Sequence, residues 1–285
     1  MKASTCESDT GMECPICSSS MEICFTTQVL NKYQAQYEVC RECGFLRVHE
    51  PHWLEEAYSS VIALADTGLV MRNIGVACKL AGGLYWLLND RGDSRCLDAA
   101  GGYGMLTRLM RDMGFDFYWH DKYCNNLLAT GFEYRQSYGS CRVVTAIEVL
   151  EHVTNPVSYI EEILSFSGAN TLIFTTELYE GDPPKPDDWW YYALSTGQHI
   201  GFFQRRTLLA IANRLGLHFA SANGIHIFSK TKVNKHLLRI VTKGWISRIA
   251  LLWIRRRLVS RTMEDHYLML HKISEDESQC NENSL

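Results

Sequence analysis

The chain has 285 residues, of which 46% are hydrophobic and 21% charged. This composition supports a folded core and excludes a mainly disordered protein. The formal net charge of −4 excludes a uniformly basic protein that coats nucleic acid. Neither a signal peptide nor a membrane-spanning apolar run is visible, so we expect a cytoplasmic protein. In a reducing compartment, its eleven cysteines favour metal binding over disulfides.

Four of the cysteines form two C-x-x-C pairs, Cys14 with Cys17 and Cys40 with Cys43, which 22 residues separate. Two such turns on paired hairpins can direct four thiolates at one ion. Gly44, directly after the second pair, suits a tight turn. The spacing predicts a zinc ribbon whose zinc is structural, because four protein ligands leave no open position. The alternative is a chance pairing of reduced cysteines in a cysteine-rich chain.

A glycine-rich turn follows a predicted strand that ends near Leu97. A helix to about Met113 and a second strand over residues 115–120 come next. This order presents a glycine turn and a helix N-terminus to a ligand. The residues that we expect to bind this ligand are Asp98, Gly101, Gly102, Gly104 and, after the second strand, Asp121.

The acidic residue before the glycines bears on the identity of the ligand. A dinucleotide fingerprint would read G-x-G-x-x-G, whereas here Asp98 precedes the glycines. A carboxylate at this point repels a pyrophosphate but suits a cofactor with an amine and a sulfonium, which favours S-adenosylmethionine over NAD. Asp121 can accept hydrogen bonds from both ribose hydroxyls of such a cofactor. The alternative is a packing turn in an unrelated α/β domain.

Three polar side chains follow the strand predicted over residues 142–147. Glu148, Glu151 and His152 stand at its carboxyl end, where open α/β sheets bind their ligands. On a helical turn the three would share one face. They could bind a divalent cation, His152 or His199 could serve as a general base, or the cluster could only shape the wall of a pocket.

At this point the chain resembles a known family. The segments LDAAGGYG, HDKY, TAIEVLEHVTNP and LIFTTEL, within residues 94–228, resemble the class I S-adenosylmethionine-dependent methyltransferases that share the "EVLEHV" segment. The resemblance implies an α/β, Rossmann-like fold with a seven-stranded, mostly parallel sheet and a reversed last hairpin. It implies that Asp98 and the glycines surround the methionine part of the cofactor and that Asp121 holds the ribose; we also assign Glu148 to cofactor binding. Ala100 departs from many members, which have a glycine nearer the aspartate.

Some members of this broad family, such as small-RNA 2′-O-methyltransferases and ubiquinone-pathway O-methyltransferases, bind a divalent metal through a Glu-x-x-Glu-His set. By this resemblance, Glu148, Glu151, His152 and His199 would bind Mg²⁺. The same residues also occur in members that use no metal. The alternative that His199 or His152 acts as a general base therefore stays open. His199, His152 and Glu151 are therefore the catalytic candidates.

The cysteine pairs are followed by PHWLEEAY (residues 51–58), Asp66-Thr67-Gly68 and Arg72-Asn73. With these segments the N-terminal half is similar to bacterial methyltransferases of sugar and surface-polysaccharide pathways. An acidic, proline-rich loop over residues 180–188 precedes four aromatic residues, Trp189, Trp190, Tyr191 and Tyr192. Exposed aromatics beside acids suit binding of a sugar; alternatively they form a lid that covers the core. We expect O-methylation of a sugar, a glycan intermediate or another small molecule. The alternatives are an RNA methyltransferase, disfavoured because the pI is acidic, and a zinc-ribbon scaffold with an inactive methyltransferase fold.

The C-terminal part is basic, with ten Lys/Arg and no Asp/Glu from Lys230 to Arg261. Residues 235–261 are helical by period, with a break at Gly244. They could dock on the fold, lie on an anionic membrane as a peripheral contact, or grip a phosphate-bearing partner. The expected segments are a zinc ribbon (1–48), a helical connector (49–93), a methyltransferase core (94–230), a basic helical appendage (231–273) and a disordered tail (274–285).

Overall fold

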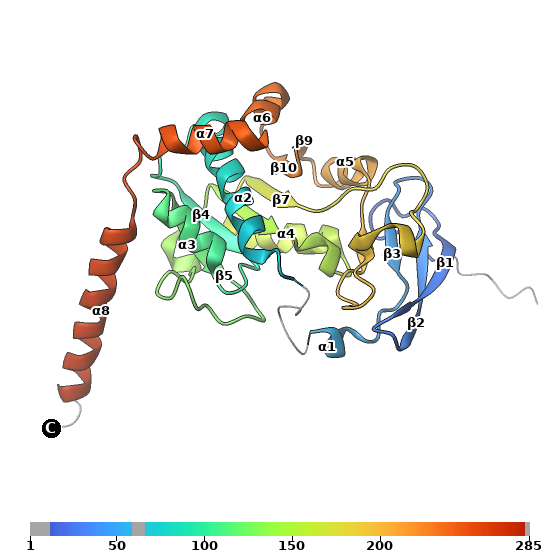
Figure 1. Ribbon diagram of the computed structural model, residues 1–285, viewed down its shortest axis with the longest axis horizontal. Coiled ribbons are helices and arrows are strands. Elements are labelled where there is room, and N and C mark those ends of the chain that lie inside the picture. The colour runs from blue at the N-terminus through green and yellow to red at the C-terminus, as the bar shows by residue number, and fades with distance from the viewer. Residues whose placement is uncertain (1–11, 59–65, 283–285) are drawn as a thin grey trace, which may run out of the picture. The chain divides into compact units, whose positions relative to one another are not determined.

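The computed structural model describes residues 12–58 and 66–282 (Figure 1). Parts of the predicted zinc ribbon, connector and tail that fall on residues 1–11, 59–65 and 283–285 lie outside the described residues. The chain divides into two compact units. Unit 1 comprises Met1–Ser60, Leu150–Ile160 and Thr176–Leu217, and unit 2 comprises Val61–Val149, Glu161–Thr175 and His218–Leu285.

Unit 2 is built on a six-stranded sheet of order β5-β4-β6-β7-β10-β9. The strands are β4 (Arg95–Ala99), β5 (Asp116–His120), β6 (Val143–Ile147), β7 (Thr171–Thr175), β9 (His218–Ala222) and β10 (Ile225–Ser229). Strands β4 to β7 pair in parallel, and β10 is antiparallel to both β7 and β9. The central strands are apolar along almost their whole length, as strands buried on both faces must be. The predicted Rossmann-like α/β class and the reversed last hairpin are confirmed.

The resemblance implied seven strands, whereas the described residues of this sheet form six. Beside β5, Glu133 makes one isolated parallel bridge with Trp119. Gly131, with φ +90°, precedes this bridge, and a 3₁₀ helix over Gln136–Tyr138 follows it. The chain therefore turns away before a second residue pair can form, and a single bridge takes the place of the seventh strand.

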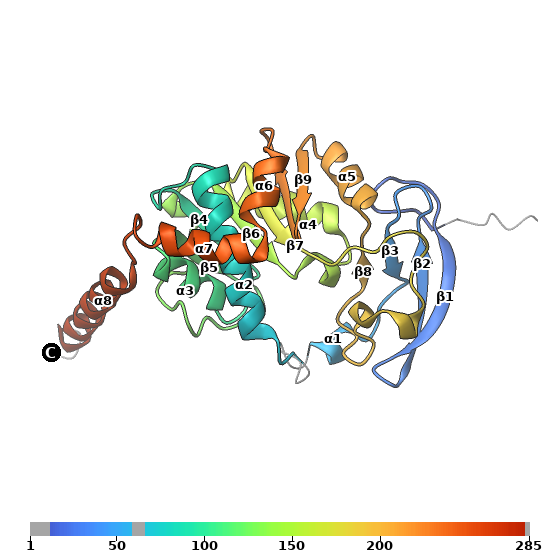
Figure 2. The ribbon, with the colours of Figure 1, turned by 45° about the horizontal axis from the view of Figure 1, so that its top comes forward.

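Helices of unit 2 complete its core. They are α2 (Leu69–Gly82), which continues as a π-helical turn over Gly83–Leu87, α3 (Met105–Asp112), the later part of α4 (Pro156–Ser167), α6 (Lys235–Val241), α7 (Gly244–Ile254) and α8 (Thr262–Glu282). Helices α2 and α7 lie side by side in both ribbon views (Figures 1 and 2). Leu238 of α6 and Ile254 of α7 are fully buried in the same cluster as Phe117 and Ile173 of the sheet. The basic segment therefore docks on the fold through one face.

Helix α8 extends into the segment that we expected to be disordered. It continues to Glu282, and no glycine or proline interrupts residues 262–282. A buried ion pair anchors its first turn: Asp265 accepts hydrogen bonds at 2.6–2.8 Å from Arg111. Burial alone would raise the pKa of the Asp265 carboxyl, but Arg111 and Arg108 lower it below its usual range. Residues 274–282 are acidic, which suggested disorder, but they continue a helix whose first turn is anchored by the Asp265–Arg111 ion pair.

Unit 1 combines the N-terminal cysteine hairpins with residues 176–217, which follow β7. Its four-stranded antiparallel sheet has the order β1-β2-β3-β8. The strands are β1 (Glu22–Val29), β2 (Tyr33–Val39), β3 (Leu46–Val48) and β8 (Gly201–Phe202). The unit also contains α1 (Leu54–Ala57), the start of α4, α5 (Arg205–Arg214), and 3₁₀ turns over Leu150–His152, Pro186–Asp188 and Trp190–Tyr192. Tyr37, Trp53 and Phe202 pack in one core, so the hairpins and residues 176–217 fold as one body.

Within residues 12–58 and 66–282, no helix is both long and apolar enough to cross a membrane.

Candidate functional site

The four predicted zinc ligands converge in unit 1. The Sγ atoms of Cys14 and Cys43 are 3.6 Å apart, and those of Cys17 and Cys40 are 3.4 Å apart. All four Sγ atoms lie within 4.8 Å of one another. A tetrahedral ion with Zn–S bonds of ~2.3 Å requires S···S separations of ~3.8 Å. The cluster therefore has the size and the donor set that a structural zinc ion needs.

Helix α5 holds both turns that carry these cysteines. Arg214 donates hydrogen bonds to the carbonyls of Pro15 and Ile16 in the first turn. Thr207 donates to the carbonyl of Cys43 in the second turn. Gly44, with φ +72°, lies so close to Gln204 that a Cβ atom would stand 2.5 Å from its amide oxygen. The second turn therefore needs glycine for both reasons, which confirms the role predicted for Gly44.

The glycine turn of unit 2 follows β4 and precedes α3. Ala100, Gly102 and Gly104 have φ of +55°, +55° and +87°, so three of five successive residues are left-handed. A Cβ atom on Gly101 would stand 2.7 Å from the Trp119 ring. The indole N–H of Trp119 donates to the carbonyl of Gly102 at 2.8 Å. Ala100 thus adopts, with strain, the conformation for which many members use glycine.

Asp98 lies beneath this turn. It is 2% exposed and accepts hydrogen bonds from the hydroxyls of Thr145 on β6, at 2.9 Å, and Thr107 on α3, at 3.3 Å. Burial raises the pKa of Asp98 to about 7, against the hydrogen bonds of both threonines. Because Asp98 is buried, its carboxylate affects a ligand at the glycine turn chiefly through its negative charge. The buried surroundings have a low dielectric constant and screen this charge only weakly.

Asp121, directly after β5, ties the turn to the next loop. One carboxylate oxygen accepts from the backbone N–H groups of Tyr123 and Cys124, and the other accepts from Gly102 N–H at 3.0 Å. Each carboxylate oxygen can accept about two hydrogen bonds. Within these contacts, the second oxygen can still accept from one more donor, such as a ribose hydroxyl.

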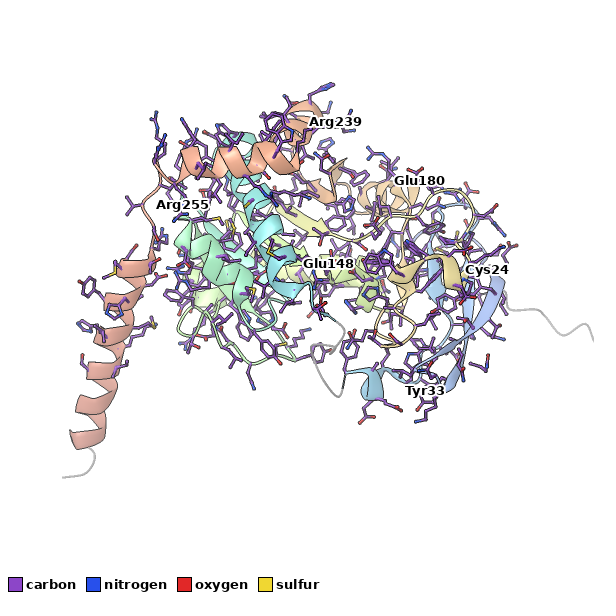
Figure 3. All side chains as sticks on the ribbon, in the orientation of Figure 1. Cys24, Tyr33, Glu148, Glu180, Arg239 and Arg255 are labelled. Atoms are coloured by element: carbon purple, nitrogen blue, oxygen red, sulfur yellow. The ribbon has the colours of Figure 1, made fainter. Side chains whose placement is uncertain are left out.

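Glu148 also belongs to unit 2, at the end of β6 (Figure 3). Its backbone is left-handed, with φ +55°, and Thr175 of β7 donates to its carboxylate at 2.5 Å. The backbone N–H of Glu148 donates to the same Thr175 hydroxyl. The turn therefore does not continue a helix through Glu151, and the shared helical face that we predicted does not form.

The other three members of the predicted metal set come together in unit 1. One ligand atom from each of Glu151, His152 and His199 lies within 4.8 Å of the other two. The ring centroids of the two histidines are 4.7 Å apart. The carboxylate of Glu151 is fully buried, and Tyr191 donates to its Oε1 at 2.7 Å. Its Oε2 is buried and has no hydrogen-bond partner, and a bound water or ion is one way to satisfy such an atom.

Both histidines are oriented by backbone carbonyls. Nδ1 of His199 lies 2.6 Å from the carbonyl oxygen of Tyr191, and Nδ1 of His152 lies 3.1 Å from that of Gln198. Because a carbonyl only accepts hydrogen bonds, each Nδ1 carries a proton, and in the neutral imidazole the lone pair is then on Nε2. This tautomer is typical of histidines that bind a metal. Burial raises the pKa of Glu151, whereas the charge of His199 and the hydrogen bond from Tyr191 act to lower it.

The four aromatic residues predicted to bind substrate do not share one role. Tyr191 and Tyr192 are both 1% exposed, so the expectation of four exposed aromatics is wrong for these two. Tyr191 contacts the Glu151–His199 cluster, and Tyr192 packs in the core with Trp189. Trp190 alone among the four is fully exposed to solvent, at 79%. The two tyrosines are buried because their segment packs against the four-stranded sheet of unit 1, and burying their rings there is favourable.

Comparison with protein-family models gives one match, to the family described as "Methyltransferase domain", over residues 77–222. The match spans more than half of the chain. The chain belongs to this family. It carries an S-adenosylmethionine-dependent methyltransferase domain, as the sequence predicted.

The methyltransferase is also similar to solved structures. TnmH matches at 13% identity with a TM-score of 0.41, over 62% of this chain and 60% of that one. Mitomycin 7-O-methyltransferase MmcR matches at 14% with a TM-score of 0.36, over 54% and 53%. Magnesium protoporphyrin IX methyltransferase from Synechocystis PCC 6803 matches at 13% with a TM-score of 0.40, over 61% and 90%. The methyltransferase thus spans 60% and 53% of the length of the first two. No curated protein sequence matches the chain.

Several residues that build these sites escaped the sequence analysis. Thr145 faces Asp98 because the two are register partners across β4 and β6. Tyr58, whose hydroxyl lies 3.0 Å from Nδ1 of His152, stands 94 residues before it. Gln198 orients His152 through its backbone, which has no sequence signature. Of these residues only Thr145 could have been noticed in the sequence, because it is a polar residue within an otherwise apolar strand and so needs a buried hydrogen-bond partner.

We expect cofactor affinity to depend on the ionisation of Asp98. As the pH rises through about 7, Asp98 gains its charge beneath the turn, which favours a cationic cofactor. S-Adenosylmethionine should therefore bind about fivefold to tenfold more tightly at pH 8 than at pH 6. Asp98→Asn should remove this dependence, and Asp93→Asn, at an exposed position before the same strand, should retain it. Calorimetric titration across this range measures the effect; the same pH dependence in Asp98→Asn would contradict the assignment.

The cysteine cluster predicts one equivalent of zinc per chain. Cys43→Ser should abolish zinc binding and destabilise unit 1, because a small hairpin module depends on its ion for folding. Cys78→Ser, at a buried cysteine of unit 2, should leave zinc content unchanged. Elemental analysis of the purified variants measures both. Zinc absent from the wild-type chain, or retained in Cys43→Ser, would show that the four thiols form no metal site.

Proposed function

We propose that the enzyme methylates a hydroxyl group and that Glu151, His152 and His199 hold a divalent metal ion for this reaction. The observation that carries the proposal is the buried Oε2 of Glu151, which has no hydrogen-bond partner although two histidines lie within reach. Leaving such an oxygen unsatisfied costs about 1–3 kcal/mol. A ligand that coordinates it would recover that cost.

The donor chemistry favours a transition metal over the Mg²⁺ that the resemblance implied. Two imidazole nitrogens and one carboxylate suit manganese, iron or zinc, whereas Mg²⁺ takes mostly oxygen ligands. Glu148, which would have added a second carboxylate, belongs to unit 2 and is bonded to Thr175. Three protein ligands leave coordination positions open for an acceptor oxygen. A bound divalent ion would lower the pKa of an acceptor hydroxyl, so that the hydroxyl loses its proton near neutral pH.

The chain's own residues prepare this cluster. Tyr191 acts twice: its hydroxyl donates to Glu151, and its backbone carbonyl fixes the tautomer of His199. The carbonyl of Gln198 fixes the tautomer of His152 in the same way. Both histidines are therefore held with Nε2 as the basic atom before any ligand arrives, which reduces the cost of organising the site.

A histidine that acts as general base without metal is the second candidate mechanism. His199 with its Nε2 lone pair has the tautomer that a base requires. In most histidine bases a carboxylate orients the opposite nitrogen, whereas a carbonyl does so here, and this mechanism leaves Glu151 Oε2 unsatisfied. For that reason we favour the metal.

We further propose that the acceptor is a sugar or glycan intermediate. The loop after β7 presents the exposed Trp190 beside exposed carboxylates, including Asp187, Asp188 and Glu180, which Figure 3 labels. An aromatic face can cover the apolar side of a sugar ring, while carboxylates accept hydrogen bonds from its hydroxyls. In this proposal unit 2 binds the cofactor and unit 1 binds and activates the acceptor. The chain passes between them at Val149 and Leu150, within the "EVLEHV" segment.

The metal proposal predicts that Glu151→Gln and His199→Ala each lose Mn²⁺ binding and methyl transfer while S-adenosylmethionine affinity is unchanged. Tyr191→Phe keeps the backbone carbonyl but loses the hydroxyl, so we expect about tenfold weaker Mn²⁺ binding. Mn²⁺ binding by paramagnetic resonance and cofactor binding by calorimetry give the two readouts.

His52→Ala, at an exposed histidine of the same unit, is the matched control and should behave as wild type. Full activity after chelation, with activity lost in His199→Ala, would overturn the metal and leave the histidine base. Full turnover in His199→Ala would overturn the base.

The acceptor proposal predicts that Trp190→Ala raises KM for a saccharide acceptor about tenfold, with little change in kcat, because it removes a stacking surface. Trp245→Ala, at another exposed tryptophan, which belongs to unit 2, should leave KM unchanged. Transfer of a labelled methyl group to a panel of oligosaccharides and to RNA provides the assay. Labelling of RNA alone, or an unchanged KM in Trp190→Ala, would contradict a sugar acceptor.

A further inference from the structure

Helix α7 is apolar on two opposite faces. One face packs into unit 2 through Ser247, Ala250 and Ile254, which are at most 9% exposed. The opposite face carries Trp245, Ile249 and Leu252, which are 60%, 59% and 64% exposed. Docking on the fold therefore accounts for only half of the apolar side chains of this helix.

The exposed apolar residues form a continuous stripe. Trp245, Ile249 and Leu252 are spaced four and three residues apart, so at about 100° per residue they lie within about 60° of one another around the helix axis. Trp253, 40% exposed, widens the stripe on one side. Single exposed apolar residues are ordinary, but a stripe along two turns of one helix marks an interaction surface.

Positive charge surrounds this stripe. Exposed arginines stand beside it at Arg248, Arg255, Arg256 and Arg257. Figure 3 labels Arg255 at the end of α7 and Arg239 on α6. From Lys230 to Arg261 there are ten basic residues and no acidic one, although the whole chain carries a net charge of −4. The partner must therefore offer an apolar layer with negative charge next to it.

We propose that the exposed face of α7 seats the protein on the surface of an anionic lipid bilayer. Trp245, Ile249 and Leu252 would enter the boundary between headgroups and acyl chains, and the arginines would pair with lipid phosphates and carboxylates. Tryptophan is well suited to this boundary, and arginine can reach outward along its own apolar stem. With 11 residues and a length of about 16 Å, α7 lies along the surface.

A second copy of the chain fits this face less well. A two-fold interface would bring the same surface against itself and would place the four arginines of one copy among those of the other. Like charges close together oppose such contacts. A bilayer surface with anionic lipids offers the opposite charge at every position along the helix, which is why the charge pattern selects it.

The test is flotation of the full chain with vesicles of phosphatidylcholine alone and with vesicles that also contain phosphatidylserine. We expect binding to the anionic vesicles that weakens as salt is raised. The triple variant Trp245→Ser, Ile249→Ser, Leu252→Ser should bind them at least tenfold more weakly. Arg255→Gln, Arg256→Gln, Arg257→Gln should also bind at least tenfold more weakly. Trp253 is left in place because its ring packs against Tyr85 and Trp86.

Matched controls distinguish binding through this face of α7 from non-specific hydrophobic binding to vesicles. Tyr267→Ser with Leu270→Ser removes exposed apolar side chains from α8, and the double variant should float as wild type does. All variants should bind S-adenosylmethionine normally, which shows that unit 2 is folded. Failure of the wild-type chain to float, or equal flotation of the triple serine variant, would overturn the proposal. A concentration-dependent dimer in solution that the triple serine variant abolishes would overturn it in favour of a second copy.

Discussion

Parallel pairing of β4 with β5 and β6 is the constraint on which the cofactor half of this methyltransferase depends. The register sets Asp98 opposite Trp119 on one side and Thr145 on the other. Thr145 thereby donates a hydrogen bond to Asp98 beneath the glycine turn, and the Trp119 indole donates to the carbonyl of Gly102 within that turn. Because the carboxyl ends of parallel strands share an edge, Asp121 also reaches this turn, through the N–H of Gly102. A different register would separate all of these groups.

A buried carboxylate organises the other half. Glu151 is fully buried in unit 1, and apart from its neighbour His152 the groups that face it, Tyr191 and His199, come from a segment distant in sequence. The residue after His199 links the two segments, because the Ile200 N–H donates to the Glu151 carbonyl and the Val48 N–H of β3 donates to the Ile200 carbonyl. The sheet of β3 also carries the cysteine hairpins. A structural ion at the cysteines would thus stabilise the framework in which the polar cluster is held.

The residues of the two candidate sites belong to different compact units. Residues of the glycine turn, with Asp121 and Glu148, belong to unit 2, and the cluster of Glu151, His152 and His199 belongs to unit 1. The "EVLEHV" segment contains the point at which the chain passes from one to the other. A short motif that resembles one catalytic turn therefore contributes residues to both units. The left-handed conformation of Glu148 is the local reason, because it ends the strand without starting a helix.

The sequence by itself determined the features that depend on local spacing and on order along the chain. The two C-x-x-C turns, the glycine turn between a strand and a helix, and the reversed last hairpin were all predictable, because each is encoded in short segments. Only the tertiary structure decided that Tyr191 is buried against Glu151 while Trp190 is exposed, and that α7 leaves an apolar face uncovered. Burial and long-range hydrogen bonds set these outcomes, and both depend on which distant segments pack together rather than on the residue types alone.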